Sequence, residues 1–477
     1  MVKSYEELAG AVGRAQQFRR RRHDAAALFS GAPPALYFDD RPYELKNISG
    51  SGSGAVAPLD QGRDPLDEIN RIGVLRLVQN GRNLFLGAAR IARAETRGGS
   101  VYSGFALEHG QFDLDALRKL NAAAIAGSAS RASADVNPQY KAFCADVVNY
   151  VAGYLERIDR VIAPLESGMD DAEKNALACD LCESAAKGWR EIVAQGNAFV
   201  IPHQRVKRER LAIKAYTERV LTRTLLGGEG WRRTYFKPMG YPGDFRIMNY
   251  IYDGAPVGAD TASKFLHLLS LVGAEPVKTR MRRLAEIILA EAARFPAGET
   301  ISALSIGAGP AREAEELLRL SGGDRSWRFA LLDQEEEALE YASARLGALN
   351  RTGLVAVRAF NASFKEMLDP TPAAALAEET HVIYSAGLVD YLNPLIARRF
   401  VKRLYEMLKP GGCIIIGNVN DKTSGMIWPS EYVVDWSLFF RNREEMLDMA
   451  SGIPDAEVSI EVDSLDAIYF LVIRKPA

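Results

Sequence analysis

A glycine turn holds the residues of this chain that are best suited to chemistry. An apolar run at 303–306 opens into four residues that precede a helical pattern, Gly307, Ala308, Gly309 and Pro310. Glycine lets a backbone turn sharply and approach a ligand, and the free N–H groups that begin a helix face that ligand. Arg312 stands where a dinucleotide-binding turn has its third glycine. The turn therefore predicts a site for a small cofactor, and it disfavours a pyrophosphate on the helix.

Polar residues at the ends of later apolar runs add to this signal. The run at 329–332 ends in Asp333, and Gln334 follows it. A carboxylate at this place can accept hydrogen bonds from both hydroxyls of a ribose. We expect cofactor contacts also from residues that end two further runs, Ser385, Ala386, Gly387 and Asn361. Asn361 is a candidate for adenine contact, and the alternative is a simple turn residue.

These residues require a sheet whose strands alternate with helices. Apolar runs recur at 303–306, 329–333, 355–360, 381–388 and 413–417, and helical patterns fill the intervals. Such alternation predicts a parallel, doubly wound α/β sheet of the Rossmann-like kind. The helix at 404–409 is ended by Pro410 and Gly411. Two alternating runs, at 456–462 and 467–474, predict an antiparallel edge.

The order of these features is that of a known enzyme family. The glycine turn, Asp333 and the Leu-Lys-Pro-Gly-Gly element at 408–412 resemble the class I S-adenosylmethionine-dependent methyltransferases over residues 298–420. The resemblance implies S-adenosylmethionine as the cofactor. Many members carry an acid two residues before the first glycine, where this chain has Ser305, so contact to the amino-acid moiety is expected to be partly remade. The alternative is a nucleotide-binding or noncatalytic Rossmann-like domain, but a tight turn alone does not explain Asp333.

The loop at 235–249 is a second informative segment. It places two glycines, two prolines and Asp244 among aromatic residues. This composition predicts an ordered loop that leads into a helix, with Asp244 as the helix cap. One interpretation is a loop that joins two domains. The other is a lid that closes over the cofactor pocket, because long, specified loops beside such sites often act as lids.

Four motifs make the resemblance more specific. They are the loop Gly240–Phe245, the turn Gly309–Glu313, the strand exit Ile383–Leu392 and an expected helix with Asp435, Trp436, Leu438 and Arg441. Together they resemble the bacterial proteins of 3-hydroxypalmitic acid methyl ester biosynthesis, over residues 235–445. The resemblance implies methyl transfer to a small molecule such as a fatty-acid or hydroxy fatty-acid carboxylate, and thus an O-methyltransferase.

The catalytic candidates depend on the acceptor. A carboxylate is already ionised near neutral pH and needs no general base, so Arg441 or Arg280 would orient it. Tyr241, Tyr391 and Trp436 would then wall the pocket. A hydroxyl or amine acceptor would need a base, for which Asp390 or Asp244 is available. The alternative for Asp390 is a helix N-cap after a strand, and for Trp436 it is packing in a cover helix.

The first hundred residues show a different pattern. Short apolar runs at 43–48, 73–78, 88–94 and 102–107, separated by turn residues, predict a small antiparallel β-barrel. With the arginine cluster at 19–22 and the motif Asn47-x-Ser49-x-x-Gly52, this part resembles PilZ domains, many of which bind cyclic di-GMP. The resemblance implies nucleotide contacts from Arg19, Arg20, Asn47, Ser49 and Gly52. The Arg-x-x-x-Arg spacing of that family is absent, so a docking barrel without a nucleotide is the alternative.

Composition narrows the possible partners. The chain has 477 residues with 59 Lys+Arg and 61 Asp+Glu, a formal net charge of −2. It lacks the global basic charge of a nucleic-acid-binding protein. No signal peptide or membrane span is predicted, and we expect a cytoplasmic protein. Cys179 and Cys182 lie in a helical pattern without a second ligand pair, which indicates buried helical thiols, and no metal site is predicted.

The sequence predicts three parts: a PilZ-like barrel at 1–115, a helical domain at 116–235, and a methyltransferase domain at 236–477 with a lid segment at 236–297. Two functional hypotheses follow. In the first, the chain is a methyltransferase for a small-molecule substrate, regulated by cyclic di-GMP through the barrel. In the second, it is a noncatalytic signalling or scaffold protein with a Rossmann-like domain and a docking barrel. The sequence leaves the oligomeric state open.

Overall fold

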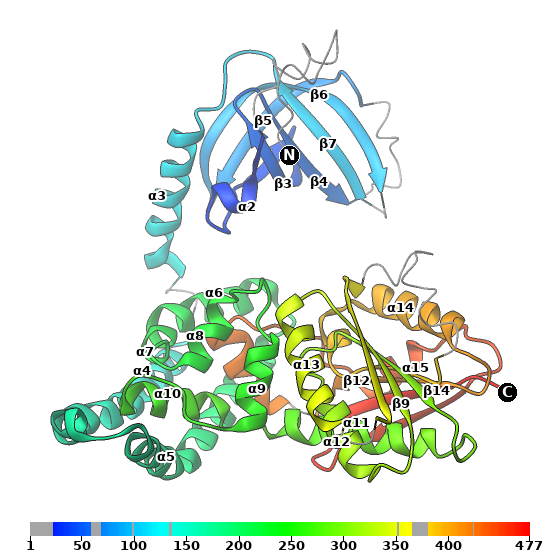
Figure 1. Cartoon of the computed structure of the whole chain (residues 1–477). Helices are drawn as coiled ribbons and strands as arrows, with labels where there is room; N and C mark the ends of the chain where they lie inside the picture. Colours follow the sequence, from blue (N-terminus) through cyan, green and yellow to red (C-terminus); the bar gives the residue numbers. More distant parts are fainter. Residues whose placement is uncertain are drawn as a thin grey trace, which may run out of the picture. The chain divides into compact units, whose positions relative to one another are not determined.

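The computed structural model of the chain has two compact units, residues 1–135 and 136–477 (Figure 1). It describes residues 22–58, 68–97, 100–132, 136–350, 353–364, 380–422 and 424–477. The predicted nucleotide contacts Arg19 and Arg20 lie outside these described residues.

The first unit is a closed antiparallel β-barrel. Its strands are β1 (His23–Asp24), β2 (Ala35–Phe38), β3 (Arg41–Ser49), β4 (Gly52–Pro58), β5 (Ile72–Gln79), β6 (Arg82–Arg97) and β7 (Ser100–Leu107). The order β3-β2-β5-β6-β7-β4 closes because β4 also pairs with β3, while β1 pairs with β3 outside this ring. Closure removes the unpaired edges of an open sheet. The prediction of an N-terminal antiparallel barrel is confirmed.

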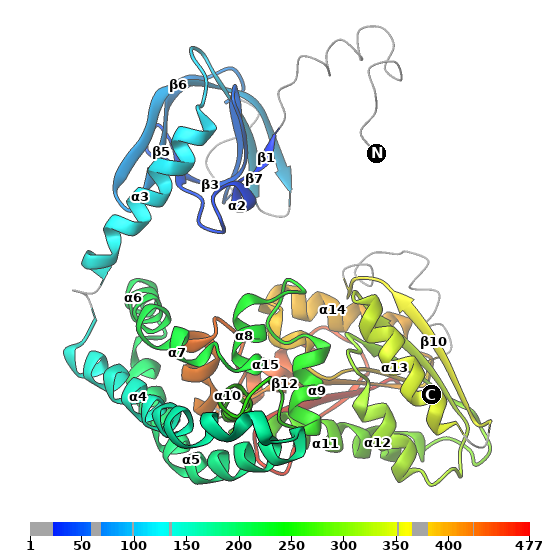
Figure 2. The ribbon, with the colours of Figure 1, turned by 60° about the vertical axis from the view of Figure 1, so that its left-hand side comes forward.

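Alternating apolar residues fill the barrel, and two helices cover it. Leu36, Leu75 and Phe105 point inward with almost no exposed surface. A short helix, α2 (Ala25–Leu28), lies beside them, and α3 (Leu114–Ala132) runs along the wall formed by β5 and β6 (Figure 2). Leu117 of α3 belongs to the same core. The barrel unit therefore includes α3, which lies beyond residue 115.

A seven-stranded sheet organises the second unit. Its strands are β8 (Ile301–Ile306), β9 (Trp327–Asp333), β10 (Val355–Asn361), β11 (Val382–Ser385), β12 (Cys413–Val419), β13 (Glu457–Val462) and β14 (Ile468–Arg474). The order is β10-β9-β8-β11-β12-β14-β13, and β14 is antiparallel to both of its neighbours. The strand order reverses between β8 and β11. Ligands of such sheets bind at the carboxyl ends of the strands beside this reversal.

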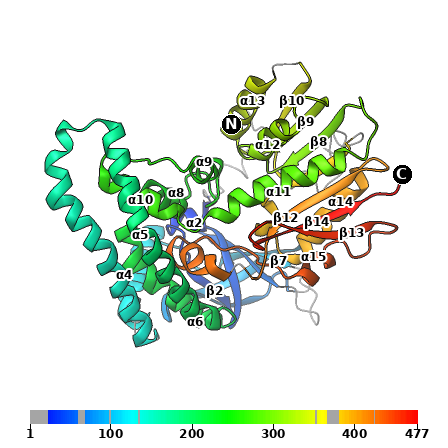
Figure 3. The same cartoon turned by 90° about the horizontal axis from the view of Figure 1, so that it is seen from below.

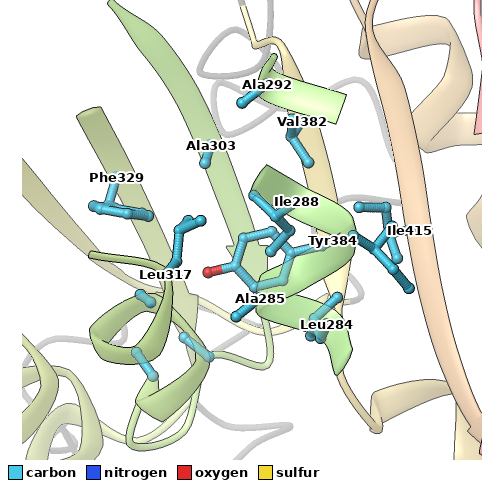
Figure 4. Packing of buried hydrophobic residues seen from close by; sticks show 14 of the residues in the cluster. Leu284, Ala285, Ile288, Ala292, Ala303, Leu317, Phe329, Val382, Tyr384 and Ile415 are labelled. Carbon is cyan, nitrogen blue, oxygen red and sulfur yellow. The ribbon is translucent and has the colours of Figure 1, made fainter. Parts of the chain in front are cut away.

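Helices cover both faces of this sheet. They are α11 (Glu275–Ala292), α12 (Arg312–Leu320), α13 (Glu336–Leu349), α14 (Pro394–Met407) and α15 (Arg443–Asp448). The apolar residues of α11, α12 and α13 share one core with the sheet, and those of α14 and α15 share another. Figure 4 shows the Tyr384 ring among aliphatic side chains of α11 and neighbouring strands. The predicted helix stop before Gly411 is confirmed, because α14 ends at Met407.

A helical segment precedes the sheet and lies to one side of it (Figure 3). Its α-helices are α4 (Pro138–Arg157), α5 (Asp171–Val200), α6 (Lys207–Thr217), α7 (Arg223–Leu225), α8 (Glu229–Phe236), α9 (Phe245–Asp253) and α10 (Thr261–Leu271). Shorter helical turns are η2 (Ile158–Ile162), η3 (Ala163–Gly168), η4 (Ile201–His203) and η5 (Glu218–Thr222). The remaining turns follow the strands of the sheet: η8 (Leu388–Tyr391), η9 (Ser424–Met426) and η10 (Trp428–Val433).

The turn η10 joins the helical segment to the sheet. Trp428 is fully buried among the aromatic residues of the helices. Its indole Nε1–H donates to Tyr140 Oη at 3.0 Å, and its backbone N–H donates to Asn197 Oδ1 at 2.8 Å. A buried Trp needs such an acceptor for its N–H. The chain after β12 therefore completes the core of helices that come more than two hundred residues earlier.

Two expectations about local structure are wrong. Residues 435–440 are not helical, because Asp435 takes a left-handed φ of 56° after η10 and the next helix begins only at Arg443, capped by Asn442. Asp435 instead accepts hydrogen bonds from Lys214 and Lys237. Cys179 does lie in helix α5, but it is exposed rather than buried.

Among the described residues, no helix combines the length and apolar character that crossing a membrane requires.

Candidate functional site

A cavity of about 560 Å³ lies in the second unit, at the end of the sheet where the strand order reverses. Its lining includes the glycine turn after β8, the residues that follow β9 and β11, and side chains of helices α5 and α8 to α11. Pockets of this size and mixed lining are typical of small-molecule sites. The sheet supplies the polar end of this cavity, and the helical segment supplies an apolar end.

The glycine turn has the backbone conformation that its sequence predicts. Gly307 and Gly309 have φ values of +65° and +52°, in the region that favours glycine. A Cβ at Gly309 would meet no atom within 4 Å, so the space above the turn is open. Ala311, with a φ of 49°, also takes the left-handed conformation before α12 begins. All four predicted turn residues, Gly307, Ala308, Gly309 and Pro310, line the cavity.

Asp333 is fixed beside this turn. Its Oδ2 accepts the Gly309 N–H at 2.8 Å, and its Oδ1 accepts the Glu335 N–H at 2.9 Å. Burial raises the pKa of the carboxyl, while these backbone N–H groups lower it. Each oxygen keeps a lone pair for a further donor, such as a ribose hydroxyl. Gln334, which is exposed, also lines the cavity.

Asn361 lies next to this site without lining the cavity. Its amide Nδ2 donates to the carbonyl of Gln334 at 3.0 Å, at the end of β10. In this structure the side chain holds the backbone that carries Asp333 and Gln334.

The residues after β11 form the other side of the polar end. Ala386 and Gly387 line the cavity, whereas Ser385 is fully buried and its Oγ has no hydrogen-bond partner among the residues that the structure describes. A Cβ at Gly387 would come within 2.4 Å of Arg280 Nη1. Glycine at 387 therefore allows a guanidinium from α11 to lie directly on the backbone. Arg280 is 9% exposed and lines the cavity.

Asp390 faces this guanidinium from the turn η8. Its Oδ2 lies 3.5 Å from Arg280 Nη1, and its Oδ1 accepts the Val419 N–H at 2.8 Å. Burial raises the pKa of Asp390 to about 6, although Arg280 opposes the shift. The N-cap alternative for Asp390 is wrong, because Asn393 caps the helix that follows.

Two tyrosines line the cavity close to the charged residues of its polar end. Tyr391 Oη accepts the Trp436 Nε1–H at 2.9 Å, and both rings lie so close to Gly243 that a Cβ there would meet Tyr391 Oη at 2.5 Å. Tyr241 lies in the same loop, and both tyrosines line the cavity. Burial raises the pKa of Tyr241 and of Tyr391. Both phenols are therefore protonated near neutral pH, and each has an O–H to donate.

Two predicted catalytic residues do not line the cavity. Asp244 is the N-cap of α9, as predicted, and its Oδ1 accepts the Arg246 and Ile247 N–H groups at 3.0 and 3.1 Å. It also pairs with Arg233 at 2.8 Å. Arg441 is buried and donates to the backbone carbonyls of Val389 and Leu392, so it fixes η8.

Several lining residues were not predicted as site residues. Glu313, on the first turn of α12, is 4% exposed and lines the cavity beside the glycine turn. Glu313 belongs to the predicted turn motif Gly309–Glu313, but the sequence alone assigns it no function. The apolar end is lined by residues that include Trp189, Trp231, Thr234, Met248, Ile251, Leu271 and Val434. These come from distant segments, and nothing in the local sequence marks them as parts of one site.

The barrel unit brings part of its predicted motif together. Asn47 lies against Gly54, where a Cβ would come within 2.7 Å of its Oδ1, and that oxygen accepts a hydrogen bond from Arg22 Nη1 at 3.0 Å. Ser49 Oγ donates to the Gly52 carbonyl at 3.2 Å within the β3–β4 turn. On the neighbouring strands, the Arg93 side chain lies over Gly104, which pairs with Gly54.

The chain is similar to known proteins in structure, whereas comparisons of its sequence found no match. No protein-family model matches the sequence, and the search of curated proteins found no match. A possible exported protein from Bordetella parapertussis is 14% identical, with a TM-score of 0.40 over 62% of this chain and 97% of that one. Magnesium protoporphyrin IX methyltransferase from Synechocystis PCC 6803, with S-adenosylmethionine bound, is 10% identical, with a TM-score of 0.34 over 51% and 95%. The CurJ carbon methyltransferase is 12% identical, with a TM-score of 0.34 over 69% and 99%.

Proposed function

We propose that this chain is an S-adenosylmethionine-dependent methyltransferase that methylates the carboxylate of an apolar, fatty-acid-like molecule. One observation carries the proposal: the same cavity is lined by a glycine turn with an acid at the next strand end, by an apolar end and by two protonated tyrosines. A polar donor and an apolar acceptor can thus meet at the tyrosines.

The residues of the polar end fit the donor. The open space above Gly309 admits a ligand close to the backbone, and the fixed carboxylate of Asp333 suits the two hydroxyls of a ribose. Arg280 and Glu313 offer a cation and an anion on the other side of the turn, for an amino-acid moiety. When bound, S-adenosylmethionine supplies an electrophilic methyl carbon on its sulfonium.

The residues between the two ends fit a carboxylate acceptor. Tyr391 already accepts a hydrogen bond from Trp436, so its own O–H remains to donate, and Tyr241 has the same capacity. Hydrogen bonds to an ionised acceptor are stronger than neutral ones. The tyrosines would hold the carboxylate with one oxygen toward the methyl carbon. The surrounding aromatic side chains would exclude water and keep the two reactants in line.

A hydroxyl or amine acceptor fits less well, because it needs a general base. The Asp390 carboxylate is engaged by the Val419 N–H and by Arg280. The Asp244 carboxylate is engaged by a helix N-terminus and by Arg233. Asp390 lines the cavity but has a partner at each oxygen, and Asp244 does not line the cavity, which favours O-methylation of an acid that is already ionised.

The proposal is tested by turnover with a labelled donor. Purified protein is incubated with S-adenosylmethionine that carries a trideuterated methyl group and with 3-hydroxypalmitate, and the products are analysed by mass spectrometry. We expect a labelled product that mild alkaline hydrolysis converts back to the free acid, because an ester is cleaved and an ether is not. A labelled ether would contradict carboxylate transfer. Absence of S-adenosylmethionine binding would contradict the enzyme and favour a noncatalytic signalling or scaffold role.

For the barrel unit we propose a second function, the binding of cyclic di-GMP by a PilZ-like domain that regulates the enzyme. The supporting observation is the outer wall formed by β3, β4, β7 and β6, where the Asn47 side chain lies over Gly54 and the Arg93 side chain lies over Gly104. Arginine side chains bind phosphates and stack on guanine. Arg93 makes no hydrogen bond or ion pair with any described residue.

Titration of the full chain with cyclic di-GMP tests this second proposal. We expect micromolar binding that Arg93→Ala weakens about tenfold, the value of one charged hydrogen bond. The control is Arg118→Ala, which removes an exposed arginine on α3. The absence of heat with the unsubstituted protein would leave the barrel as a docking module.

A further inference from the structure

The carboxyl group of Glu313 has the setting of a ligand-binding acid. It lies on the first turn of α12, is 4% exposed and lines the cavity beside the glycine turn. Its Oε1 has no hydrogen-bond partner in the part of the chain that the structure describes. A buried polar atom without a partner costs free energy, and such atoms in native proteins call for an explanation. A ligand that donates to Glu313 would supply the missing partner.

Charged and titratable groups on several elements face Glu313 and restrict the kind of ligand that can bind there. Burial raises the pKa of its carboxyl, Tyr384 and then Arg280, which faces it from α11, lower this pKa, and Glu315, on the same helix as Glu313, raises it. Tyr384 faces it from β11, and Tyr252 from α9 is close enough for the charge on Glu313 to raise its pKa. Burial has the largest effect and raises the pKa of Glu313 to about 7.

Arg280 and Glu313 together present one positive and one negative charge to the same cavity. Within the described residues they form no ion pair with each other, and Arg280 Nε is buried without a hydrogen-bond partner. An α-amino acid carries an ammonium and a carboxylate on one carbon, so it complements such a pair. Arg280 also has Asp390 at 3.5 Å, so among the described residues Glu313 is the member of this pair without a charged partner of its own.

The sheet topology places this pair opposite Asp333. β8 lies between β9, which ends in Asp333, and β11, after which Arg280 lies on Gly387. A ligand that crosses the glycine turn can therefore have its ribose at Asp333 and its amino-acid end at Arg280 and Glu313. S-adenosylmethionine has these two groups at its two ends.

We propose that Glu313 binds the ammonium group of the donor's amino-acid end, with Arg280 facing its carboxylate. This inference rests on the proposed methyltransferase function, because it assumes that the ligand is S-adenosylmethionine. Ser305, on the strand below, is buried and uncharged, so the negative charge at this place comes from α12 instead of from the strand.

Binding of the donor should be coupled to the loss of a proton from Glu313. Glu313 must be ionised to bind an ammonium, so ligand binding releases a proton wherever the free enzyme holds Glu313 protonated. For an acid of pKa about 7, the ionised fraction grows about eightfold between pH 6.0 and pH 7.5. The affinity for the donor should grow by the same factor over this range.

Calorimetry with three ligands tests the proposal on the full chain. S-adenosylmethionine and S-adenosylhomocysteine carry the ammonium, whereas methylthioadenosine lacks the amino-acid end. At pH 6.0, in two buffers of different ionisation enthalpy, we expect the first two ligands to release about one proton and methylthioadenosine to release none. At pH 7.5, Glu313→Gln should weaken the first two about tenfold or more and leave methylthioadenosine within twofold.

Glu316→Gln is the matched control, because Glu316 lies on the same helix, pairs with Arg319 and does not line the cavity. It should leave all three affinities unchanged. Binding of S-adenosylmethionine without proton release, or an equal loss for methylthioadenosine in Glu313→Gln, would overturn the role of Glu313. A loss for S-adenosylmethionine but not for S-adenosylhomocysteine would also overturn it. If the unsubstituted protein binds no S-adenosylmethionine, it is the proposed function that fails.

The proton release of the unsubstituted protein keeps the test decisive if Glu313→Gln folds poorly. Thermal unfolding without ligand shows whether the variant is folded.

Discussion

The two ends of the cavity are built in different ways. The polar end consists of the ends of strands and the start of one helix, and most of its residues follow directly after a strand. The apolar end is assembled from side chains of α5, α8, α9 and α10 and from the chain near η10, which are far apart in the sequence. The polar end suits a cofactor that many proteins share. The residues of the apolar end can differ between proteins with different substrates, while the polar end keeps its structure.

The two ends should therefore respond independently to substitution. A change at the strand ends should alter donor binding, and a change among the helices should alter only the acceptor. A variant that alters both equally would break this separation.

Asp333→Ala should have the largest effect. It removes the acceptor of two backbone N–H groups, which is also the acceptor that we assign to the ribose hydroxyls. Charged hydrogen bonds contribute about 1.5–3 kcal/mol each, so the affinity for S-adenosylmethionine should fall at least a hundredfold by calorimetry. Acceptor binding, measured with 3-hydroxypalmitate, should change less than threefold. Donor affinity within threefold of the original would show that Asp333 does not face the donor.

Tyr391→Phe should have the next largest effect, and on the acceptor side. The substitution removes the O–H that we assign to the acceptor carboxylate and leaves the ring beside Trp436. The loss of one such hydrogen bond should lower kcat/KM for the acid about tenfold to hundredfold. Calorimetry should find an unchanged affinity for S-adenosylmethionine. An unchanged kcat/KM would remove Tyr391 from the acceptor site.

Trp231→Leu should change which acceptors are preferred. Trp231 packs against Trp189 with their ring centroids 5.8 Å apart, and both line the apolar end. A smaller side chain lengthens this end of the cavity. The kcat/KM for an acid two carbons longer, divided by the kcat/KM for the original acid, should therefore rise about tenfold. Competition between acids of different chain length in one reaction measures the ratio. A uniform loss for all chain lengths would indicate damage to the helical core instead.

The smallest expected effect concerns stability and pH. Burial raises the pKa of Glu313 to about 7, so the free enzyme favours the protonated acid. The stability that this preference contributes is present below the unfolded pKa near 4.5 and is lost as the pH rises through 7. Glu313→Gln should therefore gain stability relative to the original protein between pH 5.5 and pH 8. Thermal melts of both proteins without ligand measure this difference. A constant difference would mean that Glu313 does not titrate in this range.

Much of the polar end could be predicted from sequence, because local rules determine it. Gly307 and Gly309 are needed for a left-handed turn. The alternation of strands and helices places Asp333 at the end of the next strand, on the same edge of the sheet. The cap role of Asp244 also depends only on neighbouring residues.

The other parts of the site could not be predicted, because they depend on contacts between distant segments. The role of Arg441 in fixing η8 depends on carbonyls about fifty residues earlier. The approach of Arg280 to Gly387 depends on how α11 lies on the sheet. Trp189 and Trp231 have the spacing of core residues, and only the packed helices show that they also line a cavity.

A crystal structure of the protein with S-adenosylhomocysteine and 3-hydroxypalmitate bound would test the central claim most directly. The account predicts the ribose hydroxyls at Asp333, the carboxylate within hydrogen-bond distance of Tyr241 and Tyr391, and the alkyl chain against the Trp189–Trp231 pair at the apolar end. An acid bound outside this cavity, or one with its chain toward the glycine turn, would contradict the account.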